Sequence, residues 1–209
     1  MTANRLEPFH LALHELRNRL TTGAYASGAR LTAGELAAEL GVSPTPMREV
    51  LARLTGEGLL EDRRGQGFFL RRLSARDVAD LYALNLMHLE IASEALRRAP
   101  AAPAADPPAP HAATAADGAI ATADRLFARW VAEAGGAMLS RSFLRAQTQL
   151  APVRRLEPRH LDDLVEEYER LATATAGDQR TQEVRRFFRR RLRVAGRLAE
   201  DLEPPPQPT

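Results

Sequence analysis

The sequence predicts a mainly α protein in two parts: an N-terminal region of short helices with a β-hairpin, and an all-α antiparallel helical bundle. Residues 1–73 are punctuated by glycines, and their apolar pattern changes from helical spacing to two short runs. Residues 74–203 keep helical periodicity around one Ala/Pro-rich stretch. We therefore expect one domain over 1–73, a second over 74–203, and a disordered tail over 204–209.

The first two predicted helices are short and clearly bounded. Leucines at helical spacing predict a helix over residues 5–22 that ends near Gly23. A second helix carries Leu36, Ala37 and Leu40, and Gly41 is the type of residue that closes a helix in a left-handed conformation. The short spacing to the next apolar stripe predicts a tight turn between two helices.

The third predicted helix has one apolar face and one polar face. Ser43 supplies a hydroxyl for its N-cap, and Pro46 falls in the first turn, where no intrahelical N–H bond is lost. The predicted buried stripe is Met47, Val50, Leu51 and Leu54. The remaining positions, among them Thr45, Arg48, Glu49, Ala52 and Arg53, fall on the other faces.

A β-hairpin is predicted after Gly58. Two short apolar runs, around residues 59–60 and 68–70, enclose a basic turn with the sequence Arg63-Arg64-Gly65-Gln66-Gly67. Two closely spaced helices followed by a hairpin predict a winged helix-turn-helix, with the hairpin as the wing beside the third helix.

The second region is predicted to be helical throughout. Ser74 and Asp77 resemble a capping box. The helix after them should have an inner face of Val78, Leu81, Leu84, His88, Ile91 and Ala95. Residues 99–116 contain five prolines and predict a mobile loop. Helical spacing resumes at Leu126, breaks at Gly135-Gly136, and continues in further helices, two of them separated near Gly177-Asp178.

Composition limits the classes of function. The chain contains no cysteine, which excludes disulfides and thiolate metal sites and fits a reducing compartment. No apolar run approaches the roughly 20 residues that span a bilayer, so we expect a cytoplasmic protein with no membrane partner. All 29 basic residues are arginine. Residues 1–73 hold ten of them against eight acids, so the net positive charge lies in the first region.

The first region closely resembles the GntR family of bacterial transcription regulators. The resemblance covers about residues 8–72 and is carried by the strings Leu40-Gly41-Val42-Ser43-Pro44-Thr45-Pro46-Met47-Arg48-Glu49-Val50-Leu51 and Leu54-x-x-Glu57-Gly58-Leu59. The second region is similar to the FCD type of effector domain, the FadR-like subgroup, which is a helical bundle.

The resemblance implies roles for residues of the third helix and the wing. Ser43, Thr45 and Arg48 would meet phosphates and bases in the major groove, while Arg64 and Gly65 would reach the minor groove. The fork of an arginine suits bidentate contact with guanine. For Arg53, a phosphate contact and a solvated surface charge are equally open.

Two departures from the family bear on which operator is read. The chain has Pro44 and Gly34 where family members often have arginine. Loss of both arginine donors should weaken contacts with phosphates or bases and change the operator sequence that is preferred.

Many FCD-type domains hold a metal through one Asp and three His. Here Asp124 fits the Asp, but Ala128 stands at the first His position, and no His occurs near Glu166 to Tyr168 or within Arg189 to Arg191. One carboxylate does not provide the several ligands that a transition metal requires. The sequence therefore predicts no metal in this site, and no other cofactor.

Two residues outside this set are candidates for effector contact. His88, on an apolar face, is either a hydrogen-bonded core residue or faces an effector. The basic segment Arg185 to Arg193 is either a solvated face paired with acids such as Asp162, Asp163, Glu166 and Glu167, or provides one inward arginine, with Arg189 as the candidate, for an acidic effector. His10 and His14 are expected at the surface.

These features predict a sequence-specific DNA-binding regulator, with repression as the expected outcome. Its partners would be an operator duplex, a second copy of the chain, and a small-molecule effector, acidic if an inward arginine binds it. The alternative is a ligand-independent dimer whose bundle is filled by Trp130, Phe143, Tyr168 and Phe187. A helical enzyme with an accessory head is a remote third reading, because the chain has no G-x-S-x-G, phosphate-binding glycine loop or H-E-x-x-H.

Overall fold

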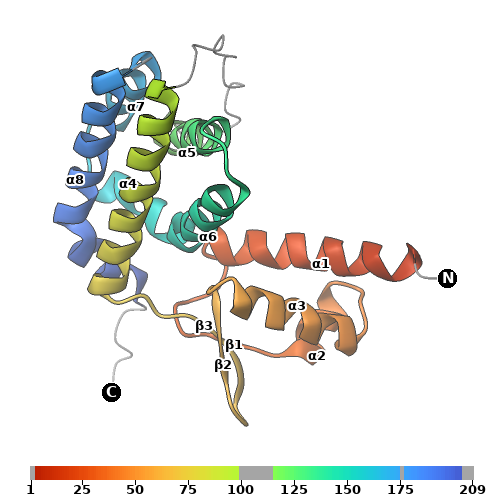
Figure 1. Ribbon diagram of the computed structural model, residues 1–209. Helices are drawn as coiled ribbons and strands as arrows, with labels where there is room; N and C mark the ends of the chain where they lie inside the picture. The colour runs from red at the N-terminus through yellow and green to blue at the C-terminus, as the bar shows by residue number, and fades with distance from the viewer. Residues whose placement is uncertain (1–2, 99–114, 175–176, 204–209) are drawn as a thin grey trace, which may run out of the picture. The chain divides into compact units, whose positions relative to one another are not determined.

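The computed structural model describes residues 3–98, 115–174 and 177–203, which form two compact units divided between Leu73 and Ser74. Figure 1 shows the helices and strands of both units. The predicted tail over 204–209, and residues 99–114 of the predicted loop over 99–116, lie outside the described residues. The last two residues of that predicted loop belong to a helix.

The first unit is a winged helix-turn-helix, as predicted. Its elements are α1 (Ala3–Thr21), β1 (Arg30–Leu31), α2 (Ala33–Glu39), α3 (Pro44–Gly56), β2 (Leu60–Arg63) and β3 (Gly67–Leu70). The hairpin of β2 and β3 is antiparallel and brings Arg63 opposite Gly67. Strand β1 joins the other edge of β3 to give the order β1-β3-β2. Strand β1 was not predicted, because two residues are too few for a periodic pattern.

The core of the first unit is apolar, and α3 is anchored in it. Met47, Val50, Leu51 and Leu54 are all 0% exposed. They pack in one cluster with buried residues that include Leu16, Leu20, Leu31, Leu36 and Leu60, and Phe68 and Leu70 of β3 pack against it. Burial of each such side chain stabilises the fold by roughly 1.5–3 kcal/mol. The orientation of α3 is therefore fixed by its buried stripe, which leaves its opposite face at the surface.

Glycine permits the tight turn between α2 and α3. Gly41 has φ +65°, and Val42 N–H donates to the carbonyl of Ala37 across the turn. A left-handed residue at this point ends α2 without continuing it, which is the conformation that glycine adopts with least strain.

The second unit is an all-α bundle, as predicted. It contains α4 (Ala75–Arg98), α5 (Ala115–Glu133), α6 (Ala137–Arg154), a 3-10 turn (Glu157–Arg159), α7 (Leu164–Thr173) and α8 (Gly177–Leu202) (Figure 1). The capping box that begins α4 is formed: Ser74 N–H donates to Asp77 Oδ2 at 2.9 Å, and Asp77 N–H donates to Ser74 Oγ at 3.1 Å.

The inner face predicted for α4 was partly wrong. Leu84 is 40% exposed and Ile91 is 54% exposed, while the buried positions are Val78, Tyr82, Asn85, His88, Leu89, Ala92 and Ser93. Helix α4 carries apolar residues on two faces, and spacing alone does not say which face packs. Of the polar side chains on the packed face, Tyr82 donates to Glu157 and His88 is hydrogen-bonded to Ser142, whereas Asn85 Oδ1 and Ser93 Oγ have no hydrogen-bond partner among the described residues.

Among the described residues, no helix is both long and apolar enough to cross a bilayer.

Candidate functional site

The exposed face of α3 carries the residues predicted to meet DNA. Ser43, Thr45, Arg48 and Arg53 are all exposed. Since the buried stripe of α3 faces the core of the unit, these four side chains are presented by a rigid helix.

The N-terminus of α3 lacks the predicted side-chain cap. Ser43 stands at the N-cap with extended backbone, φ −79° and ψ 157°, but its hydroxyl makes no capping hydrogen bond. The N–H groups of a first helical turn attract anions when they have no internal acceptor. Pro44 and Pro46 have no N–H, and the N–H of Met47 donates to the Ser43 carbonyl at 3.3 Å. The N–H of Thr45 and the Ser43 hydroxyl are therefore the groups of this turn that suit a phosphate contact.

Arg48 and Arg53 differ in how they are held. Arg53 Nε donates to Glu57 Oε1 at 3.1 Å, and Glu57 also binds Arg17, whose Nη2 lies 2.7 Å from the same oxygen. Arg48 forms no hydrogen bond or ion pair with any described residue. Arg48 is thus the basic side chain of α3 whose donors are all available to a ligand.

The wing repeats this contrast. Arg63 donates to Glu61 through Nη2 at 3.0 Å and lies over the Phe69 ring at 4.3 Å from its centroid. Arg64 is exposed and has no such partner within the described part of the chain. Gly65, at the turn, has φ +74°. The wing tip therefore offers one restrained arginine and one free arginine.

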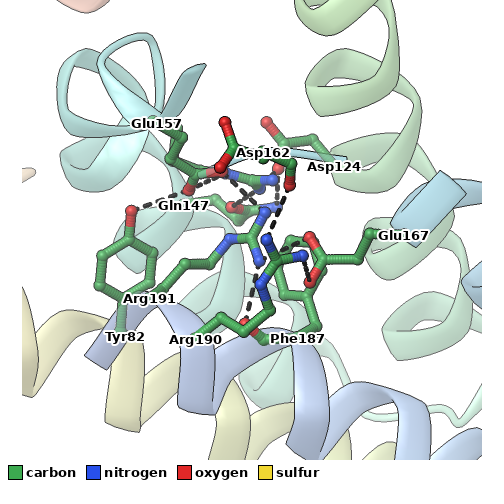
Figure 2. A network of polar contacts seen from close by, with 10 residues as sticks. Tyr82, Asp124, Gln147, Glu157, Asp162, Glu167, Phe187, Arg190 and Arg191 are labelled. Atoms are coloured by element: carbon green, nitrogen blue, oxygen red, sulfur yellow. Dashed lines mark hydrogen bonds and ion pairs between the residues drawn. The ribbon is translucent and has the colours of Figure 1, made fainter. Parts of the chain in front are cut away.

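The interior of the second unit holds a network of buried charges (Figure 2). Arg191 is 1% exposed and bridges two carboxylates: its Nη2 donates to Glu157 Oε2 at 2.8 Å and its Nη1 to Glu167 Oε2 at 2.9 Å. Tyr82 donates its hydroxyl to the other Glu157 oxygen at 2.8 Å. Arg190 donates to Glu167 Oε1 at 3.1 Å. The network thus joins α4, α7, α8 and the 3-10 turn.

Arg154 extends the network towards α5. It is 3% exposed, forms an ion pair with Asp124, and places Nε 3.3 Å from Glu157 Oε1. Gln147 donates to Asp124 Oδ1 at 3.1 Å. Figure 2 shows Asp124, Gln147 and Glu157 within the same group of polar side chains. Nη2 of Arg154 is buried and has no hydrogen-bond partner within the described residues.

Ionisation inside the network follows from these contacts. Burial alone would raise the pKa of Glu157, but Arg191 and Arg154 outweigh burial and hold this pKa below its usual value. Burial, followed by the neighbouring Glu157 charge, raises the pKa of Tyr82 well above its usual value. Glu157 is therefore ionised and Tyr82 neutral at pH 7, as the hydrogen bond between them requires.

In the alternative with one inward arginine, the choice of Arg189 as that arginine was wrong. Arg189 is exposed, and Arg191 is the side chain inside the bundle. Residues two positions apart, such as Arg189 and Arg191, point about 200° away from each other around a helix, so only one of them faces the core. Arg191 continues the buried stripe of Val184, Phe187, Phe188, Ala195 and Leu198. An arginine in phase with an apolar stripe was the signal in the sequence that could have identified it.

Three further residues of the network were missed or misplaced. Glu167 was expected on an exposed face, but is 2% exposed. Glu157 and Arg154 were not singled out at all. Glu157 lies in a short 3-10 turn, where no helical period marks the inner side, and its burial depends on partners far away in the sequence.

The aromatic filling that would favour the ligand-independent alternative is present in part. Trp130, Phe143 and Phe187 are buried, whereas Tyr168 is half-buried. The Phe127 ring contacts both Trp130 and Phe187, with centroids 5.8 and 5.1 Å apart.

His88 is a core residue with a hydrogen bond. It is 5% exposed, its Nε2 lies 2.9 Å from Ser142 Oγ, and its ring meets the edge of Phe143. Burial lowers the pKa of His88. Contact with an effector is untested for His88, Asp124 and Arg189. His10 and His14 are exposed, as expected.

The residues at the position of the family metal do not fit a metal ion. Asp124 is paired with Arg154, and Glu167 is paired with Arg190 and Arg191. No group of three His, Cys, Asp or Glu side chains in the described ranges converges on one point. Arginine cations, instead of a metal, neutralise the carboxylates in this part of the bundle. The absence of a metal stays a prediction that metal analysis of the purified protein would test.

Comparison with known proteins bears on both units. Residues 12–70 match the model of the family described as "Bacterial regulatory proteins, gntR family". The Nta operon transcriptional regulator of Aminobacter aminovorans is 50% identical over 60 residues, 29% of each chain. HTH-type transcriptional regulator McbR of Escherichia coli is 36% identical over 87 residues, 40% of this chain and 39% of McbR. These alignments span less than half the length of the curated relatives.

Two solved structures match nearly the whole chain in fold. E. coli McbR/YncC aligns with a TM-score of 0.62 at 18% identity, over 91% of this chain and 97% of that one. A putative transcriptional regulator GntR from Rhodococcus sp. RHA1 aligns with a TM-score of 0.65 at 17% identity, over 92% and 97%. At these identities the match shows the fold alone, which is the predicted winged helix-turn-helix followed by an all-α unit.

Proposed function

We propose that this chain, whose N-terminal domain belongs to the GntR family, is a homodimeric transcription regulator that reads an operator with the exposed face of α3. The observation that carries the proposal is the environment of Arg48. It is exposed on a helix that is locked by four fully buried side chains, and it is unpaired within the described residues. Such a side chain can bind a guanine without first breaking an internal ion pair.

The other exposed groups position the helix. Ser43 and Thr45 lie at the first turn of α3, where hydroxyl and N–H donors suit phosphates. Arg64, beside Gly65 at the wing tip, is the candidate for the minor groove. Arg53 would contribute a phosphate contact only by sharing its charge with Glu57.

A dimer would read two related half-sites, so we expect an operator with two-fold symmetry. One curated relative is named as a repressor, the gluconate operon transcriptional repressor of Bacillus licheniformis, which is 34% identical over 85 residues. We infer repression for this chain, action in the cytoplasm, where the DNA is, and no catalytic role.

The test is fluorescence anisotropy with a duplex from the DNA upstream of the chain's own gene and a scrambled duplex, at several salt concentrations. Wild type should prefer the upstream duplex. Arg48→Ala should weaken this binding about 5- to 150-fold, the range of a lost bidentate base contact, and remove the preference. Arg145→Ala, which removes an exposed arginine of α6, is the matched control and should bind as wild type does.

Equal binding of both duplexes by wild type, falling steeply with salt, would indicate attraction to phosphate alone. If Arg48→Ala kept both the wild-type affinity and the preference for the upstream duplex, Arg48 of α3 would not contact bases.

A second candidate function is supported by Arg154. Its Nη1 is paired with Asp124, but its buried Nη2 has no partner among the described residues and suits a carboxylate ligand, so the second unit would sense an acidic small molecule. The opposing version, a bundle with a purely structural role, is supported by the pairing of the other buried charges. Thermal unfolding with a panel of mono- and dicarboxylates separates them: a rise in Tm that Arg154→Met abolishes supports sensing, and no shift with any carboxylate supports the structural role.

A further inference from the structure

The outer face of α4 carries an apolar stripe that the unit itself does not cover. Leu84, Met87 and Ile91 are 40%, 57% and 54% exposed. Their spacing of three and four residues places them in one row. Single exposed apolar residues are ordinary on a protein surface, but a row of three on one helix marks an interaction surface.

Charged residues end the stripe on both sides. Asp80 precedes it and Arg98 follows it, with side chains 74% and 75% exposed. At 3.6 residues per turn, Asp80, the three apolar residues and Arg98 lie within about 60° around the helix. Within this sector the row is acidic at one end, apolar in the middle and basic at the other end, and Arg76 and Glu94 lie just outside it.

This arrangement is self-complementary when two copies of α4 run antiparallel. A two-fold axis level with Leu89 places Met87 opposite Ile91 of the second copy. The same axis places Asp80 opposite Arg98, because each lies nine residues from Leu89, about 13.5 Å along the helix. A parallel pair would instead oppose Asp80 to Asp80 and Arg98 to Arg98.

We propose that the outer face of α4 binds the same face of a second copy of this chain, with Met87 and Ile91 of both copies at the centre and two Asp80–Arg98 ion pairs at the rim. In one copy, Asp80 is 3.7 Å from Arg76 and Arg98 is 2.7 Å from Glu94. Both are exposed ion pairs within one helix and contribute little to stability. Asp80 and Arg98 can therefore exchange them for ion pairs with the second copy. This inference rests on the homodimer of the proposed function and adds the surface through which the two copies bind.

The first test is sedimentation equilibrium of the full chain without DNA. Met87→Glu puts a charge in the apolar centre of both copies and should raise the dimer dissociation constant at least about 30-fold. Because Met87 is exposed, circular dichroism should show an unchanged fold. The matched control is Met138→Glu, at a methionine of α6 that is 74% exposed, which should leave the dimer intact.

The second test is a charge exchange. Asp80→Arg alone and Arg98→Asp alone each oppose like charges and should weaken the dimer about tenfold. The double variant restores opposite charges and should return to within about threefold of wild type. Residues 80 and 98 are five turns apart in one helix, so rescue requires contact between copies.

A dimer that persists in Met87→Glu, or a double variant no better than either single variant, would overturn this surface and leave the homodimer standing. A wild type that is monomeric at every concentration would contradict both the surface and the homodimer. Neither result alters the DNA test of Arg48.

Discussion

Arg48 in α3 and Arg191 in α8 both lie on helices packed against apolar cores, yet their environments are opposite. Arg48 is exposed and unpaired within the described residues, whereas Arg191 is 1% exposed and bound to Glu157 and Glu167. A charge in water costs little to leave free, but a buried charge is tolerated only with partners. The same residue type therefore serves recognition in the first unit and internal order in the second.

The cores of the two units differ in the same sense. The first unit packs an apolar cluster around α3. The second buries Arg154, Glu157, Glu167 and Arg191 among its aromatic rings. Substitutions at Arg48 and Arg64 should change DNA binding with little effect on stability, and substitutions in the network should change stability with little effect on DNA binding.

The largest effect is expected for Arg191→Met. This change leaves Glu157 and Glu167 buried without their shared cation, which should lower the free energy of unfolding of the second unit by about 3–5 kcal/mol. Urea unfolding followed by circular dichroism measures it. Arg189→Met, an exposed arginine on the same helix, is the matched control and should stay within about 0.5 kcal/mol of wild type. Equal stability of the two variants would show that the network does not support the fold.

A smaller effect is expected from acid. Because the pKa of Glu157 is held below its usual value of 4.5, its contribution to stability is complete above that pH and is lost as pH falls towards the lower, folded-state pKa. Urea unfolding between pH 3 and 7 should therefore show falling stability on the acid side. Glu157→Gln should be less stable at neutral pH and less sensitive to acid. If the free energy of unfolding fell more steeply with acid in Glu157→Gln than in wild type, Glu157 would not be the ionised group that loses its contribution at low pH.

The smallest effect is expected for Arg64→Ala at the wing tip. Loss of one phosphate contact should reduce the slope of log affinity against log salt by about 1 and weaken binding similarly on specific and scrambled duplexes. The free energy of unfolding should not change, because Arg64 is exposed and unpaired in the described part of the chain. A loss of preference between the two duplexes would give Arg64 a role in base reading instead.

The first unit was predictable because its signals are local. The stripe of α3, the turn glycine Gly41 and the basic hairpin turn each lie within a few residues. Strand β1 has no such signal, since its pairing with β3 joins residues far apart in the sequence. The exposed arginines of α3 and the wing follow directly from the faces that these elements bury.

The buried network was not predictable in the same way. Tyr82 and Glu157 meet across 75 residues, and Arg191 and Glu157 across 34. Charged side chains read as surface residues by default, so Glu167 was assigned to the wrong face. Only the position of Arg191 within an apolar stripe pointed inward, and choosing it over Arg189 required the exact phase of α8.

Selection of duplexes from a randomised pool, by wild type and by Arg48→Ala, tests the central claim most directly. Wild type should enrich an inverted repeat whose half-site centres are separated by whole helical turns, about 10 base pairs or a multiple, and Arg48→Ala should not enrich it. Enrichment of the same repeat by both proteins, or of no common sequence by wild type, would contradict an account in which Arg48 reads an operator.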